Sequence, residues 1–268
     1  MYSYKYAYLK EQGGEPMYDF QKANMWKRIS AALCDIIALA IVAVGMALLL
    51  STVLGYDGYS TRLEEISNSY AVEYDVDLEI SAEELDALSE EDKARYEAAD
   101  KAFAEDDEAN YVYGMIINLS LIIVTFSILI AFLLLEFLVP LLFGNGQTVG
   151  KKVFGIAVMR TDGVKLSPVL LFARTVLGKY TVETMVPVFI ILMISLGLMG
   201  IFGTVVILGL LLLQLVLLIS TKARTPLHDK LAHTVCVDFA SQMIFDSPEA
   251  LLEYKKRIHA EQVEAQKN

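Results

Sequence analysis

Long uninterrupted runs of apolar residues constrain this chain more than any other feature of its sequence. The runs cover Ile29 to Gly55, Tyr111 to Phe143, and the 40 residues from Thr181 to Ser220. A helix needs about 20 apolar residues to cross the hydrocarbon core of a bilayer. The first two runs are therefore long enough for one span each, and the third is long enough for two. We predict an all-α integral membrane protein with about four transmembrane helices.

These runs, and the polar segments between them, define the predicted organisation. Basic residues at Lys22, Lys27 and Arg28 flank the first run, so the positive-inside rule predicts cytoplasmic N- and C-termini in a multi-pass protein of the cell membrane. The predicted regions are a flexible tail (1–24), a first span (25–55), an extracytoplasmic segment (56–110), a second span (111–143), a cytoplasmic connection (144–181), two short spans or a re-entrant hairpin (182–220) and a cytoplasmic C-terminal region (221–268).

The net negative charge of the chain is concentrated in the predicted extracytoplasmic segment. Residues 56–110 contain 19 acidic and 4 basic side chains, while the whole chain has a net charge of -11. Ser81 with Glu84 forms a capping-box pattern, which predicts an acidic helical insertion. The stretch from Asp75 to Asp86 has oxygen ligands at spacings like those of an EF-hand, but Ile80 stands where that loop needs glycine. We therefore expect solvated helices and no metal site.

The stretch FGNGQTVGKK, at 143–152, resembles a phosphate-binding loop, but its spacing excludes that function. Such a loop needs glycine five residues before the Gly-Lys pair and a hydroxyl after the lysine. Asn145 and Lys152 occupy these two positions. We interpret the stretch as a structural turn that ends the second span, with Gly144, Gly146 and Gly150 permitting the bend.

The remainder of the cytoplasmic connection contains signals for a β-hairpin and a helix. Thr161-Asp162-Gly163 is a turn between two short β-like runs, which predicts a small hairpin with HTVCVD (233–238) as a further strand beside it. Ser167 and Pro168 supply an N-cap and a first-turn proline for a helix. Because Arg174 and Lys179 interrupt its apolar surface, we predict that this helix lies in the membrane interface.

Ionisable residues inside the predicted spans are candidates for function, because charge is costly in hydrocarbon. Asp35 lies about 13 Å deep in the first span and Glu136 about 10 Å deep in the second. The two carboxylates can face each other and hold a proton, a cation or an arginine, for which Arg28 and Arg174 are available. The alternative is a structural ionic network that joins the first helix to the glycine-rich turn and the interfacial helix.

Four blocks together resemble the RDD family of membrane proteins, which is named for one arginine and two aspartates. They are WKRISAALCD, NGQTVGKKVFGIAVMRTDG, FARTVLGK and TPLHDKLAHTVCV, in this order, and the resemblance covers residues 25–61 and 111–238. It implies Arg28, Asp35 and Asp229 as the namesake residues. It also implies transport of an unspecified ligand. With the residues above, the predicted charge network is Arg28, Asp35, Glu136, Arg174 and Asp229.

The sequence does not favour catalysis or cofactor binding. His228 and His233 lie five residues apart, whereas a helical zinc pair needs four, and no nucleophile elbow is present. We expect no enzyme, no cofactor and no nucleic-acid partner. The two hypotheses are transport of an ion or small ligand, and a non-transporting adaptor that recruits a protein partner through its acidic segment or its tails. The predicted partners are the lipid bilayer, a further copy of this chain in a homo-oligomer, and that protein.

Overall fold

The computed structural model describes residues 21–195, 200–220 and 226–267. These residues form two compact units, each described here by itself. Unit 1 contains residues up to 41 and from 129 onward, and unit 2 contains residues 42–128. Residues 1–20 of the predicted tail (1–24), and residues 196–199 between the two short predicted spans, lie outside the described residues.

Four helices of the described residues are long and apolar enough to cross a membrane, which confirms the predicted fold class. The first is α1 (Met25–Leu54). The other three, with the elements that form them, are as follows: Asp107–Phe143, formed by α5 (Asp107–Phe132), η1 (Leu133–Leu138) and α6 (Val139–Phe143); Pro168–Ser195, formed by α8 (Pro168–Phe172), η2 (Ala173–Met185) and α9 (Val186–Ser195); and α10 (Gly200–Ser220).

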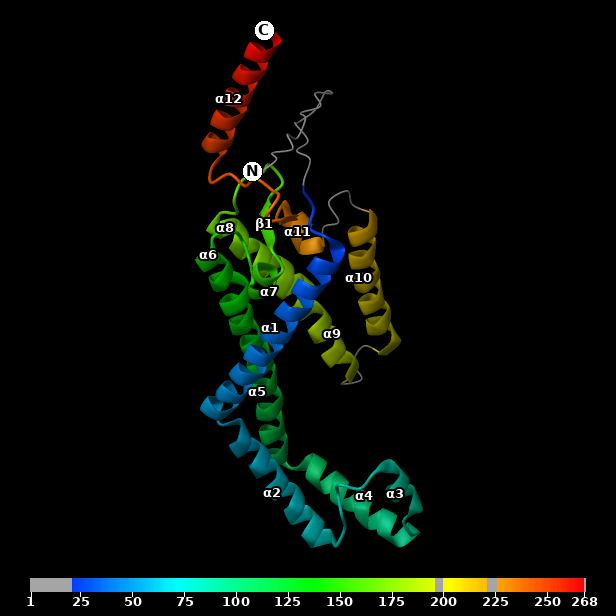
Figure 1. The fold of residues 1–268 in the computed structure, drawn as a ribbon. Coiled ribbons are helices and arrows are strands. Elements are labelled where there is room, and N and C mark those ends of the chain that lie inside the picture. Colours follow the sequence, from blue (N-terminus) through cyan, green and yellow to red (C-terminus); the bar gives the residue numbers. More distant parts are fainter. Residues whose placement is uncertain (1–20, 196–199, 221–225, 268) are drawn as a thin grey trace. The chain divides into compact units, whose positions relative to one another are not determined.

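The predicted interfacial helix is not a separate element, because it is continuous with the span predicted after it. Its start is as expected, since Ser167 accepts a hydrogen bond from the Leu170 amide and Pro168 follows. The helix then continues without interruption to Ser195 and forms the third candidate span. Arg174 and Lys179 do not hold it at a surface, because both charges have buried carboxylate partners. Figure 1 shows α9, the last part of this helix, beside α10.

A two-stranded antiparallel sheet lies beside the helices of unit 1. It pairs β1 (Ile156–Arg160) with β2 (Thr234–Asp238), and Val158 lies opposite Cys236. The predicted hairpin across Thr161-Asp162-Gly163 is corrected, since the segment after that turn forms no strand and contributes isolated bridges, from Lys165 to Met159 and from Val164 to Phe245. Two short helices precede the strands, α7 (Val149–Val153) before β1 and α11 (Leu227–Leu231) before β2 (Figure 1).

The sheet is apolar on both faces, so it forms the core of unit 1. Ala157, Met159, Val235 and Val237 pack together on one face. The opposite face contacts the first helix, because Val158 and Cys236 pack with Ala31. The last helix of the unit is α12 (Pro248–Lys267).

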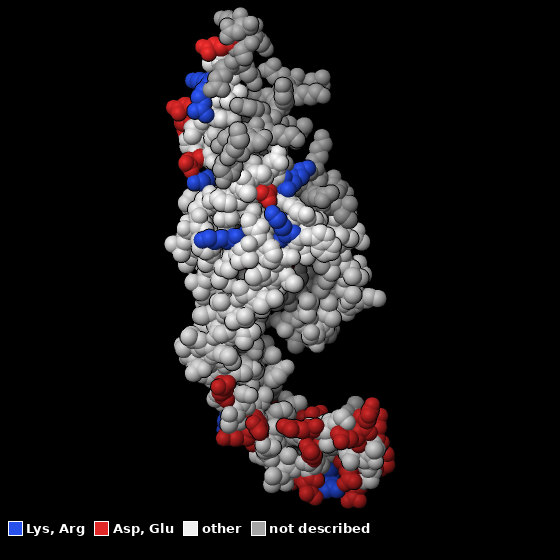
Figure 2. Space-filling view, in the orientation of Figure 1, with Lys and Arg blue, Asp and Glu red and all other residues white. Residues whose placement is uncertain are grey.

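Unit 2 contains the acidic segment, which is helical as predicted. Its helices are α2 (Tyr56–Tyr74), α3 (Ala82–Ala87) and α4 (Glu90–Glu105). The capping box of Ser81 and Glu84 is present at the start of α3. Ile66, Ala109 and Val112 form a small buried core. Figure 2 shows acidic side chains gathered on the surface of these helices.

Candidate functional site

Eight ionisable side chains of unit 1 form a buried cluster, which we call the ionic core. They come from α1, from the segments η1 and η2 of the second and third candidate spans, and from the two short helices before the strands, α7 and α11. The members are Asp35, Glu136, Lys151, Arg174, Lys179, Glu183, His228 and Asp229.

Asp35 ties α1 to the start of α7. One carboxylate oxygen accepts a hydrogen bond from the Gly150 amide at 2.7 Å, and the other accepts one from the Thr148 hydroxyl. The Lys151 ammonium lies 3.9 Å from the same carboxylate. Thr148 also caps α7 by accepting a hydrogen bond from the Lys151 amide. Asp35 is thus committed to holding the glycine-rich turn against the first helix.

The glycines of this turn have two different physical roles. Gly144 and Gly146 have left-handed backbone, with φ of 78° and 60°, which favours glycine. Gly150 is required for space, because a Cβ atom there would overlap the Ala31 carbonyl oxygen and lie 2.9 Å from an Asp35 oxygen.

Glu136 joins the second and third candidate spans. Its carboxylate accepts a hydrogen bond of 2.6 Å from the Lys179 ammonium, and its backbone carbonyl accepts one of 2.9 Å from the Thr175 hydroxyl. Glu136 is 4% exposed and Thr175 is fully buried. The two helices are therefore linked by a charge pair between residues 43 positions apart and by a neutral hydrogen bond between residues 39 positions apart.

Arg174 and Asp229 form the most deeply buried ion pair of the ionic core. The Arg174 Nε atom donates to Asp229 Oδ1 at 2.8 Å, and both side chains are 1% exposed or less. Thr234 donates to the same oxygen at 2.8 Å, and the Cys236 thiol lies 3.6 Å from the other. Burial alone would raise the pKa of Asp229, but Arg174 and His228 hold this pKa well below its usual range.

Glu183 and His228 form a carboxylate–imidazole pair at the start of α11. The His228 amide donates to Glu183 Oε1 at 2.8 Å, and His228 Nδ1 lies 2.7 Å from Oε2. Burial lowers the pKa of His228, although Asp229 and Glu183 favour its charged form. The Glu183 carboxylate thus contacts both the backbone amide and the imidazole of His228.

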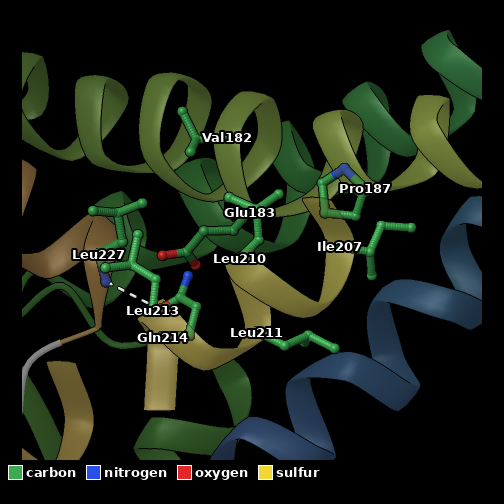
Figure 3. Close-up of a pocket in the computed structure, with 9 residues that line it drawn as sticks. All are labelled: Val182, Glu183, Pro187, Ile207, Leu210, Leu211, Leu213, Gln214 and Leu227. Carbon is green, nitrogen blue, oxygen red and sulfur yellow. Dashed lines mark hydrogen bonds between the residues drawn. The ribbon is translucent and has the colours of Figure 1, made fainter. Parts of the chain in front are cut away.

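A small cavity of about 70 Å³ lies between the third and fourth candidate spans (Figure 3). Its walls are mostly apolar, with Glu183 and Gln214 as the polar exceptions. The Gln214 side chain accepts a hydrogen bond from the Leu227 amide at 3.2 Å. The Glu183 carboxylate is thus the ionisable group of the ionic core that lines this cavity.

The predicted meeting of Asp35 and Glu136 does not occur. Each carboxylate has its own partners, and Lys151 interacts with both of them. Lys151 is only 9% exposed, although lysine usually lies at membrane surfaces. Burial, and then Lys179, lower the pKa of Lys151, while Glu136 opposes that shift. Arg28 is half-buried, and among the described residues its side chain has no hydrogen bond or ion pair.

The charges of the second and third spans share one backbone feature. Glu136 lies in the π-helical segment η1, and Arg174, Lys179 and Glu183 all lie in η2. A π-helical segment makes i→i+5 hydrogen bonds, and such segments are frequent at functional sites. The wider turns place side chains five residues apart on one face of the helix, whereas an α-helix would point them in different directions. We know of no signal in the sequence that predicts these segments.

Sequence reasoning missed four members of the ionic core: Lys151, Lys179, Glu183 and His228. The first two are lysines, which usually lie at membrane surfaces, so their burial was not expected. Their proximity to Asp35 and Glu136 depends on tertiary contacts between distant segments. For His228, only the metal-ligand hypothesis was considered, and the described residues contain no group of side chains that could hold a metal ion.

Comparison with known proteins identifies the family. The model of the RDD family matches residues 22–233, which is most of the chain. No curated protein and no solved structure matches the chain. The matched region begins just before α1, ends just before β2, and includes every residue of the ionic core. The chain is a membrane protein and belongs to the RDD family.

Proposed function

We propose that the protein moves an ion or a small ligand across the membrane and does not act as an enzyme. The observation that carries this proposal is the placement of Glu136, Arg174, Lys179 and Glu183 in the π-helical segments of two candidate spans. Ionisable residues within spans are rare and mark ion or substrate pathways. Helices that need only to pack in lipid would avoid both the charges and the irregular turns.

The pairing of these charges supports the proposal, because a charged ligand could take the place of either partner. The Glu136 carboxylate and the Lys179 ammonium neutralise each other at 2.6 Å. A cation or proton that binds Glu136 would displace Lys179, and an anion that binds Lys179 would displace Glu136. Such exchange of partners allows a charged ligand to bind without leaving an uncompensated charge in the spans.

Exposed apolar side chains support contact with lipid and with further copies of the chain. None of the apolar window of α1 is buried. The cavity between the third and fourth candidate spans, of about 70 Å³, has room for only about five water molecules, which favours a pathway formed by more than one chain. We place the protein in the cell membrane as a homo-oligomer, with both termini in the cytoplasm.

Flux through proteoliposomes tests the proposal. Purified protein in liposomes should carry at least one of three probe ions, proton, sodium or potassium, faster than empty liposomes do. Glu136→Gln should lower that flux at least tenfold, because the neutral amide cannot exchange partners as the carboxylate does. Proton flux is followed with an enclosed pH dye, and the metal ions are followed with isotopic tracers.

A matched control separates this effect from a general loss of charge. Lys165→Gln breaks an exposed ion pair with Asp246, at 2.5 Å, outside the candidate spans. This variant should transport as the wild type does. Equal flux for Glu136→Gln and wild type would contradict the assignment of Glu136 to the pathway.

One observation favours a second function, that of a membrane adaptor. The described spans carry no Asp, Glu, Lys, Arg or His over residues 36–54, 111–135, 184–195 and 200–217. A relay of charges would normally continue through these parts. Unit 2, in contrast, has its own small core and an acidic surface suited to a cationic partner protein.

Deletion of residues 60–108 discriminates between the two functions. An adaptor should lose a partner that copurifies in detergent with the full chain, while a transporter should keep its flux. A partner that remains bound after the deletion would contradict recruitment through the acidic segment.

A further inference from the structure

Two parts of the chain fold in the same way, 78 positions apart. The helices α7 and α11 have five residues each, and the residue after each has nearly the same backbone, with φ and ψ of -92° and 9° at Phe154 and of -91° and 5° at Ala232. A left-handed residue follows in both, Gly155 and His233, and then a five-residue strand. His233 adopts this conformation although it is not glycine.

The strands are related by a local two-fold axis. Val158 pairs with Cys236, and these two residues are also 78 positions apart, so each occupies the same place in its own part of the chain. We call residues related in this way counterparts. The two end pairs of the ladder, Ile156 with Asp238 and Arg160 with Thr234, exchange under this axis. We name the segments around α7 and β1 the first repeat, and those around α11 and β2 the second repeat.

A carboxylate from a long helix binds the same backbone position in each repeat. Asp35 accepts from the Gly150 amide at 2.7 Å, and Glu183 accepts from the His228 amide at 2.8 Å. Gly150 and His228 are counterparts. The backbone contact that joins each long helix to its short helix therefore needs a carboxylate and an N–H group, and it needs no side chain on the short helix.

In each repeat the long helix and the short helix lie so close together that one residue at the contact must be glycine. The two repeats differ in which helix supplies that glycine. In the first repeat the short helix supplies Gly150, which faces Ala31, one α-helical turn before Asp35. In the second repeat the long helix supplies Gly178, five residues and thus one π-helical turn before Glu183. A Cβ atom on Gly178 would lie 2.7 Å from the His228 Cβ atom. The second repeat thereby makes room for a side chain that the first repeat excludes.

We propose that His228 is a proton-binding site, built into the second repeat where the first has glycine. Its Nδ1 atom lies 2.7 Å from Glu183, which lines the cavity between the third and fourth spans (Figure 3), and its Nε2 atom lies 3.5 Å from Asp229 beside the sheet. The imidazole joins two carboxylates that otherwise belong to different parts of the ionic core. The site stands on these contacts alone, whether or not the protein transports a ligand.

The charged groups around His228 come from two elements. Asp229 on α11 and Glu183 on η2 favour the imidazolium, while Arg174 and Lys179 on η2 disfavour it. Gln214 on α10 lies beside Glu183 in the cavity wall. Burial is the largest influence and lowers the pKa of His228 below its ordinary value. The proton should therefore bind as the pH falls below about 6.5.

Nuclear magnetic resonance of isotope-labelled histidine measures this site directly in the full-length protein in lipid nanodiscs. His233→Asn and His259→Gln assign the His228 signal by removing the other two histidine signals. The His228 midpoint should lie below that of free histidine in the same buffer. Glu183→Gln should lower it further, because the carboxylate favours the charged imidazole. An ordinary midpoint, or one that Glu183→Gln leaves unchanged, would overturn the proposal.

The pH dependence of thermal stability provides an independent readout. Because the folded protein binds this proton less readily than the unfolded chain, the melting temperature of the wild type should fall as the pH falls below about 6.5. His228→Gly keeps the amide contact with Glu183, as in the first repeat, and should show a smaller fall. His259→Gln, which changes an exposed histidine, should behave as the wild type does. Coincident profiles for His228→Gly and wild type would count against the site.

Discussion

Replacement of Asp229 by alanine is expected to destabilise the protein by about 3–5 kcal/mol, the range for a buried ion pair that loses one partner. The change leaves the Arg174 guanidinium, which is 1% exposed, without its carboxylate. It also removes the acceptor for Thr234, which donates at 2.8 Å. The melting temperature of the detergent-solubilised protein and its yield in the membrane should both fall strongly.

Two matched variants show whether the unpaired charge causes this effect. Lys27→Ala breaks an ion pair with Asp238 in which the lysine is 47% exposed, and it should cost no more than about 1 kcal/mol. The double variant Arg174→Met with Asp229→Leu should recover much of the loss, since neither charge remains unpaired. An Asp229→Ala protein that melts with the wild type would show that this pair does not stabilise the fold.

Gly150→Val is expected to prevent normal accumulation of the protein in the membrane. The added side chain would overlap the Ala31 carbonyl oxygen, which belongs to the backbone of α1 and cannot move alone. The same change would displace Asp35 from the Gly150 amide, which donates at 2.7 Å. Fluorescence-detected gel filtration of solubilised membranes measures the amount of monodisperse protein.

Gly209→Ala is the control for this substitution. Gly209 lies in α10, and a Cβ atom there would meet nothing within 4 Å. The alanine variant should therefore accumulate as the wild type does. A monodisperse Gly150→Val protein with wild-type yield would contradict the close packing of α7 against α1.

The parts of the fold that could be predicted are those with local causes. Apolar runs set the four spans, and the hydroxyls of Ser81 and Ser167 cap the helices that follow them. The end of the helix that begins at Pro168 could not be predicted in this way. Its charges indicated a surface position, because the sequence does not show that Arg174 and Lys179 would meet buried carboxylates.

The partners within the ionic core depend on contacts between distant segments. Arg174 was included in the predicted charge network, but its partner Asp229 lies 55 residues away along the chain. Asp35 and Glu136 have similar predicted depths, yet depth does not determine which direction a side chain faces. The Asp35 carboxylate is bound instead by the Thr148 hydroxyl and the Gly150 amide at the start of α7, while Glu136 binds Lys179.

Repetition within the chain is nearly invisible in the sequence. The counterparts Gly150 and His228, or Lys151 and Asp229, share neither size nor charge. What the two repeats share is backbone conformation and one amide-to-carboxylate hydrogen bond in each. A comparison of amino-acid types cannot detect such a match, because the shared features are the conformation and a hydrogen bond of the main chain.

The most direct test of a role in transport is the flux of proton, sodium and potassium through proteoliposomes that contain the double variant Glu136→Gln with Lys179→Gln. Removing both charges leaves neither one unpaired, so the variant should fold and melt near the wild type. If the pair handles a ligand, flux per folded protein should fall at least tenfold while the melting temperature changes little. Wild-type flux from the folded double variant would contradict the account and leave the pair with a structural role alone.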